Sequence, residues 1–440
     1  MTGAAERIER LWVEPGVATG GRVRVPGDKS ISHRALMLGA IADGETRVTG
    51  FLAGEDCLAT MAALRALGTS IDFDATEVCV RGAGLRGLHA PAAPLDLGNS
   101  GTGMRLLTGL LAAQSFDTQL TGDASLRSRP MERIAAPLRA MGADVRTVDG
   151  CAPLAIHGGR ELTGIEYQSP VASAQIKSAL LLAGLYANGR TCVIEPGVSR
   201  DHTERMLQTF GVAVETGADF AAVSAPERLH ACSVQVPGDL SSAAFVLGAA
   251  SLGRACSVEV IDVGLNPTRT GILDILRLMG TDIVVADETL AGAEPLATLR
   301  VSPAPLRGAD IPPELVPLAI DEMPLVFALA ACAEGRTVIS GAGELRHKES
   351  DRIAMMVAGL QALGVAVEER PDGAVIEGGS IGGGTVDSAG DHRIAMAFAV
   401  LAGRADAPVT ILDTANIATS FPGFVPLMRS LGLRVSEAPP

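Results

Sequence analysis

The sequence predicts an α/β protein built from six similar repeats, which we expect to form two domains of three repeats each. Two observations lead to this expectation. A helical segment that ends in a bulky residue and a glycine recurs six times in the 440-residue chain, at spacings of 68 to 84 residues, a length that fits two helices and several short strands. The tetrapeptide Val-Pro-Gly-Asp occurs at 25–28 and again at 236–239, three repeats later. The recurring glycines are Gly68, Gly142, Gly211, Gly280, Gly364 and Gly432.

Each repeat opens with an Ala- and Leu-rich segment that is apolar on all sides and therefore predicts a buried helix. These segments are 34–42, 105–113, 177–187, 242–252, 324–333 and 393–402. A short β-branched strand follows, as at 46–50, 118–122 and 337–341. An amphipathic helix then runs to the recurring glycine, a common residue at helix C-termini. An alternating strand such as 365–368 ends the repeat.

The two Val-Pro-Gly-Asp segments predict crossovers between domains, because Pro-Gly is typical of turns. We expect one domain to comprise residues 1–25 and 238–440, with the other inserted as residues 26–237 and the crossovers near 25–28 and 236–239. Two unrelated turns are the alternative.

Composition restricts the possible functions. A formal net charge of −14 argues against a broad surface for nucleic acid or anionic membranes, and 3% aromatic residues argue against stacking on single strands. No apolar run reaches the roughly 18 residues that span a bilayer, and the first ten residues lack an apolar signal segment, so we expect a soluble, cytoplasmic protein. The seven cysteines are widely spaced without a Cys-x-x-Cys pair, so we expect neither disulfides nor a metal site.

Lysine occurs only three times, at Lys29, Lys177 and Lys348, whereas the other 33 of the 36 basic residues are arginine. Each lysine lies in a compact polar motif. An ammonium is a mobile point charge that differs chemically from the planar guanidinium fork. We therefore expect the three lysines to be functional, with a coincidence of codon usage as the alternative.

Basic residues gather at or just before the expected buried helices, where free N–H groups and a partial positive charge bind anions. They are Lys29, Arg34, Arg105, Arg127, Arg129, Lys177, Arg200, Arg269, Lys348, Arg352 and Arg393. This excess of cations suits a small substrate that carries phosphate. The glycine-rich segment 98–103 would let backbone approach an anion, with a plain turn as the alternative.

Asp321, Glu322 and Glu349 place carboxylates among these cations. Proton transfer at a charged substrate requires such an arrangement. Structural ion pairs are the alternative.

Six motifs in collinear order carry a resemblance to a known family. They are Gly-Asp-Lys-Ser-Ile-Ser-His-Arg at 27–34, Gly-Asn-Ser-Gly-Thr-Gly-Met-Arg at 98–105, Gly-Asp-Ala-Ser-Leu-Arg-Ser-Arg-Pro-Met at 122–131, Ser-Ala-Gln-Ile-Lys at 173–177, Arg-His-Lys-Glu-Ser-Asp-Arg at 346–352 and Asp-His-Arg-Ile-Ala-Met at 391–396. Over essentially its whole length the chain resembles the 5-enolpyruvylshikimate-3-phosphate synthase family. Segments 173–177, 200–204 and 266–269 resemble its class II branch.

The resemblance implies a fold of two similar domains, each with three βαβαββ units around buried parallel helices, an inside-out α/β barrel. It implies transfer of the enolpyruvyl group of phosphoenolpyruvate to the 5-hydroxyl of shikimate 3-phosphate through a tetrahedral intermediate, with release of phosphate. This reaction lies on the shikimate pathway to chorismate and the aromatic amino acids. The resemblance further implies a monomer that needs no cofactor and no metal.

Site residues are carried over position by position. The resemblance implies that the catalytic residues are Lys29, Asp321, Glu349 and His392. The implied shikimate 3-phosphate contacts are Lys29, Ser30, Arg34, Ser173, Ala174, Gln175, Arg200, Asp321 and Lys348. The implied phosphoenolpyruvate contacts are Lys29, Asn99, Gly101, Arg129, Gln175, Glu349, Arg352 and Arg393. The role of Lys177 is left open.

In the implied mechanism, Lys29 bridges the phosphoenolpyruvate phosphate and the reacting hydroxyl. Asp321 accepts the hydroxyl proton. Glu349 protonates the enol methylene and later removes that proton.

Two positions depart from patterns in the family. Thr419 stands where class I members carry lysine, so that contact is not carried over. Gly101 stands where herbicide-insensitive class II members can carry alanine, whose methyl group crowds glyphosate in the phosphoenolpyruvate site, so we expect moderate sensitivity to glyphosate.

Two other functions are weighed against this one. The related UDP-N-acetylglucosamine enolpyruvyl transferases carry asparagine after the lysine and a cysteine in a mobile loop, whereas this chain has Ser30 and no cysteine near 127–129. A protein that binds a phosphorylated metabolite without turnover is the second alternative. The presence of Lys29, Asp321 and Glu349 argues against it.

Overall fold

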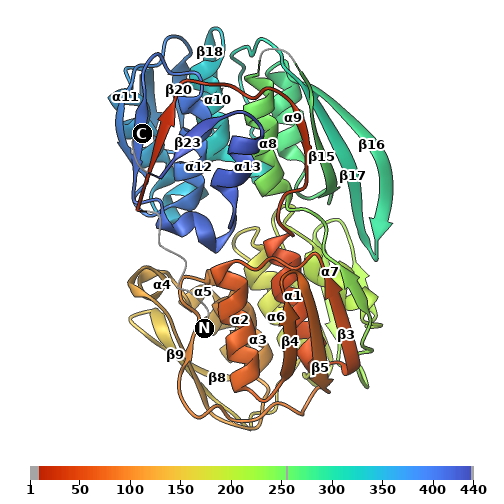
Figure 1. Cartoon of the computed structure of the whole chain (residues 1–440). Coiled ribbons are helices and arrows are strands. Elements are labelled where there is room, and N and C mark those ends of the chain that lie inside the picture. Colours follow the sequence, from red (N-terminus) through yellow and green to blue (C-terminus); the bar gives the residue numbers. More distant parts are fainter. Residues whose placement is uncertain (1–8, 254–255, 438–440) are drawn as a thin grey trace. The chain divides into compact units, whose positions relative to one another are not determined.

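The chain divides into two compact units in the computed structural model, which describes residues 9–253 and 256–437 (Figure 1). The first unit comprises Met1–Pro26, Gly238–Thr289 and Pro295–Pro440, and the second comprises Gly27–Pro237 and Leu290–Glu294. The expected segments 1–25 and 238–440 include residues 1–8, 254–255 and 438–440, which lie outside the described residues. The sequence did not indicate that the turn Leu290–Glu294 groups with the second unit.

Each unit contains three small sheets. Those of the second unit are, in strand order, β14 (Ser233–Gln235), β3 (Asp43–Thr49), β5 (Glu77–Ala83), β4 (Ser70–Asp74); β6 (Leu95–Asp96), β7 (Thr118–Thr121), β9 (Cys151–His157), β8 (Asp144–Val148); and β10 (Glu166–Gln168), β11 (Arg190–Ile194), β13 (Phe220–Ser224), β12 (Val214–Thr216). Each has one parallel pair at an edge and two antiparallel pairs; in the first, Val48 pairs with Val234 in parallel and with Val78 antiparallel. This shared topology confirms the repeat.

The first unit repeats the pattern with two changes: its middle sheet has three strands, both pairs antiparallel, and its last sheet takes a strand from the start of the chain. Its sheets are β16 (Asp282–Ala291), β17 (Glu294–Ser302), β15 (Val258–Gly264), β2 (Gly21–Val23); β18 (Arg336–Ile339), β20 (Gly373–Glu377), β19 (Ala366–Arg370); and β21 (Gly384–Asp387), β22 (Val409–Leu412), β1 (Arg10–Glu14), β23 (Arg434–Ser436). In the last sheet, β1 from the start of the chain pairs antiparallel with both β22 and β23. The N-terminal strand therefore completes the sixth repeat.

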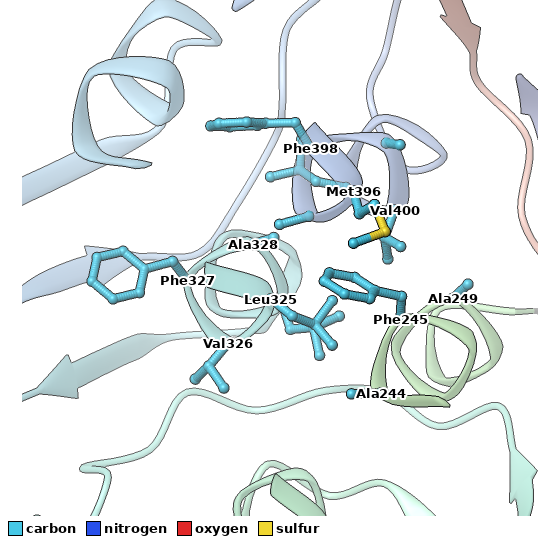
Figure 2. Close-up of a cluster of buried hydrophobic side chains, with 14 of the residues drawn as sticks. Ala244, Phe245, Ala249, Leu325, Val326, Phe327, Ala328, Met396, Phe398 and Val400 are labelled. Carbon is cyan, nitrogen blue, oxygen red and sulfur yellow. The ribbon is translucent and has the colours of Figure 1, made fainter. Parts of the chain in front are cut away.

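Six helices are buried. They are α1 (Lys29–Ile41), α3 (Gly101–Leu111) and α6 (Ala174–Gly184) in the second unit, and α8 (Leu240–Ser251), α10 (Met323–Cys332) and α12 (His392–Ala402) in the first. Phe245, Leu325, Phe327, Met396 and Phe398 extend from the last three helices into one apolar core (Figure 2). Burying each such side chain contributes about 1.5–3 kcal/mol.

The buried helices begin earlier than the sequence predicted, and in five of the six a polar cap starts the helix before the apolar run. The side chains of Asp28, Ser100, Ser173, Asp239 and Asp391 each accept a hydrogen bond from a backbone N–H of the first turn. The motif residues therefore lie inside the first turns. Arg34, expected at a helix start, lies in the middle of α1.

Six amphipathic helices complete the repeats. They are α2 (Glu55–Ala66), α5 (Glu132–Ala140), α7 (His202–Thr209), α9 (Gly271–Leu278), α11 (Arg352–Ala362) and α13 (Phe424–Ser430), accompanied by the short helix α4 (Ala124–Ser128) and the 3-10 turns η1 (Pro317–Ala319), η2 (Gly343–His347) and η3 (Ala415–Thr419). The recurring glycines follow these six helices with φ between 81° and 102°, a left-handed conformation that favours glycine. Within residues 9–253 and 256–437, none of the helices combines the length and apolarity needed to cross a membrane.

Close approach of α3 and α6 depends on Gly109. A Cβ atom at this position would lie 2.1 Å from the carbonyl oxygen of Ala179. We expect Gly109→Ala to lower the free energy of unfolding by about 1–3 kcal/mol or more, because backbone must shift to admit the methyl group. Gly379→Ala is the matched control, since no described atom lies within 4 Å of its added Cβ. Urea unfolding checks both, and equal midpoints for the two variants would contradict the prediction.

Candidate active site

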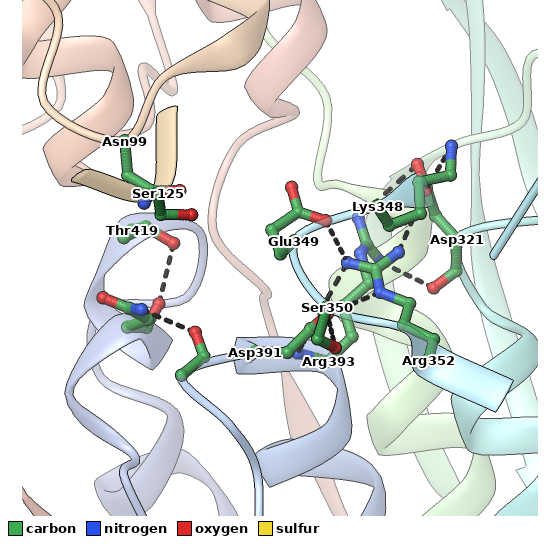
Figure 3. Close-up of polar contacts among 12 residues, drawn as sticks. Asn99, Ser125, Asp321, Lys348, Glu349, Ser350, Arg352, Asp391, Arg393 and Thr419 are labelled. Carbon is green, nitrogen blue, oxygen red and sulfur yellow. Dashed lines mark hydrogen bonds and ion pairs between the residues drawn. The ribbon is translucent and has the colours of Figure 1, made fainter. Parts of the chain in front are cut away.

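Arg352 is the centre of a charged cluster in the first unit (Figure 3). Its side chain is 1% exposed. Nε donates to Oδ2 of Asp391 at 2.7 Å, Nη2 donates to Oε2 of Glu349 at 2.7 Å, and Nη1 lies 3.5 Å from Oδ1 of Asp321. Burial acts to lower the pKa of Arg352, but these three carboxylates outweigh it and raise that pKa. The guanidinium is therefore a fixed positive charge.

Asp321 contacts three cations at once. Its carboxylate oxygens lie 3.7 Å from Nζ of Lys348, 3.5 Å from Nη1 of Arg352 and 3.8 Å from Nη2 of Arg393. Its backbone carbonyl also accepts a hydrogen bond from Nη1 of Arg393 at 3.1 Å. Five of the residues that the sequence singled out thus form one connected group, which we call the Arg352 cluster: Asp321, Lys348, Glu349, Arg352 and Arg393.

The cluster is held where two helices begin. Arg352 is the first residue of α11, and Asp351 caps that helix by accepting the N–H of Ala354 at 3.1 Å. Asp391 caps α12 by accepting the N–H of Arg393 at 2.9 Å while also holding Arg352. His392 is the first residue of α12 and is buried. Two helix N-termini and a shared aspartate therefore fix the geometry.

In the second unit, Arg34 is bound by three neighbours. Nε donates to the hydroxyl of Thr203 and Nη2 to the hydroxyl of Ser178, both at 2.7 Å, and Nη1 donates to the carbonyl of Ser30 at 2.9 Å. Burial lowers the pKa of Arg34 to about 10, so it stays protonated at neutral pH. Arg34 is the link between α1, α6 and α7.

The first turns of α3 and α6 are joined through Gln175. Its Oε1 accepts a hydrogen bond from Arg105 at 2.7 Å, and its Nε2 donates to the hydroxyl of Thr102 at 3.2 Å. Beside them, Arg129 donates to Oδ1 of Asn99 at 2.6 Å. These contacts gather the expected phosphoenolpyruvate residues of the second unit, apart from Lys29, around the start of α3.

The remaining expected residues of the second unit lie at the starts of α1, α6 and α7. Lys29, the first residue of α1, pairs with Asp56 at 3.1 Å. Ser173 and Ala174 are the cap and first residue of α6, and Arg200 is half-buried just before α7. They sit on separate helix starts of one unit.

Sequence reasoning identified Asp321 and Glu349 but missed other acidic partners of the cations. Asp391 is fully buried and holds Arg352, and Asp56 pairs with Lys29. Asp391 had a signal, since it directly precedes a buried helix at the place of a cap. Asp56 had none, because it meets Lys29 only through the packing of α2 against α1.

Among the described residues, no group of three or more His, Cys, Asp and Glu side chains could hold a metal ion.

Comparison with known proteins points to one family. The model of the family "EPSP synthase (3-phosphoshikimate 1-carboxyvinyltransferase)" matches residues 13–428. Proteins named 3-phosphoshikimate 1-carboxyvinyltransferase from Halorhodospira halophila and Alkalilimnicola ehrlichii are 59% and 58% identical over 97% of this chain, and cover 97% and 96% of their own lengths.

Solved structures agree with the sequence comparison. An EPSP synthase from Acinetobacter baumannii is 49% identical, covers 97% of this chain and 99% of its own, and superposes with a TM-score of 0.88. The enolpyruvyl transferase NikO from Streptomyces tendae, at 19% identity and a TM-score of 0.77 over 97% of this chain and 98% of its own, shares the fold. The predicted fold class is confirmed.

His33, within the 27–34 motif, makes stability depend on pH. Its ring is fully buried, Nδ1 lies 2.9 Å from the hydroxyl of Thr60, and burial with nearby Lys29 and Arg34 lowers its pKa to about 3. The unfolded chain binds this proton near pH 6.5 and the folded protein does not, so stability is lost as pH falls from 6.5 towards 3. At pH 5 the expected loss is about 2 kcal/mol.

Replacing His33 tests this dependence. Urea unfolding of the wild type and of His33→Gln at pH 7 and pH 5 should show a smaller pH-dependent loss in the variant. Carboxylates titrate in both proteins and cancel in the comparison. The same loss in both would refute the assignment.

Proposed function

The chain belongs to the EPSP synthase (3-phosphoshikimate 1-carboxyvinyltransferase) family, and we propose that the charged residues at its helix starts catalyse the reaction of that family. We assign individual roles to these residues. The chain is a transferase that moves the enolpyruvyl group of phosphoenolpyruvate to the 5-hydroxyl of shikimate 3-phosphate and releases phosphate. The reaction belongs to the shikimate pathway of aromatic amino acid biosynthesis. We propose that the enzyme works as a cytoplasmic monomer whose two units are its domains.

One observation carries the assignment of roles: the buried guanidinium of Arg352 contacts both candidate proton carriers, Asp321 and Glu349. A fixed cation between two carboxylates provides a site for an anionic reactant beside groups that can take up and release protons. We assign phosphoenolpyruvate to Arg352, Arg393 and Glu349 in the first unit. Its partners in the second unit are Lys29, Asn99, Gly101, Arg129 and Gln175.

Shikimate 3-phosphate is proposed to bind a second set of residues, which overlaps the first at Lys29 and Gln175. Its proposed contacts are Lys29, Ser30, Arg34, Ser173, Ala174, Gln175, Arg200, Asp321 and Lys348. Arg34 supports this role because three bonds already hold its guanidinium, so little side-chain entropy is lost when it binds an anion.

The reaction has two steps. In the addition, the 5-hydroxyl gives its proton to Asp321, its oxygen bonds to the central carbon of phosphoenolpyruvate, and Glu349 delivers a proton to the methylene. In the elimination, Glu349 takes a proton back from the new methyl group, the double bond re-forms and the carbon–oxygen bond to phosphate breaks. The departing phosphate takes up the proton that Asp321 had accepted. Lys29 bridges the phosphate and the reacting hydroxyl. His392 lies beside Arg393 at the start of α12.

A phosphate-release assay tests the function against its rivals. Release should require both phosphoenolpyruvate and shikimate 3-phosphate. Release with UDP-N-acetylglucosamine in place of shikimate 3-phosphate would instead identify the related transferase, and binding without release would identify a non-catalytic protein.

We expect Glu349→Gln to fold and to bind both substrates but to turn over at least about 100-fold more slowly, because a positioned acid–base group typically contributes about 10² to 10⁴ in rate. Glu377→Gln is the control, since Glu377 lies on β20 with its side chain 55% exposed. Steady-state kcat and binding of shikimate 3-phosphate by calorimetry give the two readouts. Near-normal turnover would remove Glu349 from the mechanism.

Glyphosate sensitivity depends on space at Gly101. A Cβ atom there would lie 2.9 Å from Nη1 of Arg105 and 3.2 Å from Nη1 of Arg129. We therefore expect Gly101→Ala to displace the guanidinium of Arg105, to shift that of Arg129 slightly, and to raise both the glyphosate concentration for half-inhibition and the KM for phosphoenolpyruvate. Gly379→Ala serves as the control. Unchanged inhibition in Gly101→Ala would show that the steric argument is wrong.

A further inference from the structure

Three consecutive polar residues, His202, Thr203 and Glu204, are buried in the first turn of α7. They are 1%, 1% and 3% exposed. Each makes a short polar contact, 2.7 to 2.8 Å long, with a residue outside α7. The partners are, in order, Glu294, Arg34 and Lys177. A helix start with this many buried polar contacts has a fixed position, and Arg200 lies just before it.

Lys177 lies between two buried carboxylates. Its Nζ is 2.9 Å from Oε2 of Glu195 and 2.8 Å from Oε1 of Glu204, and all three side chains are at most 7% exposed. Burial acts to lower the pKa of Lys177, but Glu204 and Glu195 outweigh it and raise that pKa. The ammonium therefore stays charged at neutral pH, as two buried carboxylates require.

Glu195 makes two further contacts that lead toward the proposed substrate site. Its Oε1 accepts a hydrogen bond from the backbone N–H of Ser173 at 2.7 Å, and its Oε2 accepts one from the hydroxyl of Ser199 at 2.7 Å. Ser173 begins the segment 173–175, and Ser199 directly precedes Arg200. Both segments carry proposed contacts to shikimate 3-phosphate.

We propose that Lys177 is a positioning residue for the shikimate 3-phosphate site. Through Glu195 it fixes segments 173–175 and 199–200, and through Glu204 it fixes the first turn of α7, without contacting substrate itself. This inference rests on the proposed function of those segments. The ammonium has three donors, which lets one group contact both Glu195 and Glu204.

The test separates Lys177 from the charge balance around it. Lys177→Met alone leaves two buried carboxylates without their cation, so the variant to use is Lys177→Met with Glu204→Gln. The cluster then keeps its net charge of −1, since Glu195 alone remains charged, while Glu195 loses its cation. We expect the KM for shikimate 3-phosphate to rise about tenfold, the effect of losing a charged hydrogen bond.

The other kinetic constants distinguish positioning from general damage. In the double variant, kcat should stay within about threefold of the wild type, because no proton carrier is altered. The KM for phosphoenolpyruvate should rise less than the KM for shikimate 3-phosphate, because Gln175 is the one residue of the loosened segments that is also assigned to phosphoenolpyruvate. Arg65→Met is the control for stability, since Arg65 on α2 bonds the carbonyl of Ile71 at 2.6 Å away from these segments. It should lower the melting temperature and leave the KM for shikimate 3-phosphate unchanged.

Ser199→Ala provides a second test that leaves both ion pairs in place. It removes only the hydroxyl bond to Glu195, and calorimetry should show weaker binding of shikimate 3-phosphate by about threefold to tenfold. If the double variant does not fold, the affinity of Ser199→Ala for shikimate 3-phosphate tests the proposal in its place. Unchanged affinity for shikimate 3-phosphate in an active protein would overturn the role of Lys177, whereas absence of substrate-dependent phosphate release from the wild type would overturn the proposed function.

Discussion

A helix that is apolar on most of its sides presents most of its polar groups near its ends, and this constraint organises both units. Six such helices occupy the two cores. Their sides bury Leu, Val and Phe, so most ionisable residues of the repeats collect at the first turns, where free N–H groups favour anions. Arg34, in the middle of α1, is an exception. The proposed site is a consequence of that packing. The reactive side chains of the proposed site therefore lie where the apolar surface of each buried helix ends.

Much of this arrangement could be predicted from the sequence, because its signals are local. The recurring glycines marked where the amphipathic helices end, and all six have the left-handed φ that the signal implies. The helix starts were less well predicted, since an apolar run shows where burial begins and not where the cap lies. The helix capped by Asp28 begins several residues before its predicted start at 34. The helix capped by Asp391 begins one residue before its predicted start at 393.

The partners of the site residues could not be predicted, because they depend on contacts between distant parts of the chain. Glu195 and Glu204 meet at Lys177 only after α6 and α7 have packed. Asp391 reaches Arg352 across 39 residues of sequence. A motif shows that a cationic side chain is present, whereas the identity of its carboxylate partner depends on which segments the fold brings into contact. Those partners determine whether a cation is held rigidly before the substrate binds. A cation held in this way is preorganised to stabilise charge in the transition state.

The N-terminal strand β1 lies between β22 and β23, the last two strands of the chain. During synthesis the ribosome makes β1 long before its two partners, so this sheet cannot close until residues 434–436 have emerged. Residues 27–237 of the second unit are contiguous and can pack much earlier. The order of translation therefore separates the two units in time, and Leu11 and Val13 of β1 cannot be buried in this sheet until β22 and β23 have formed.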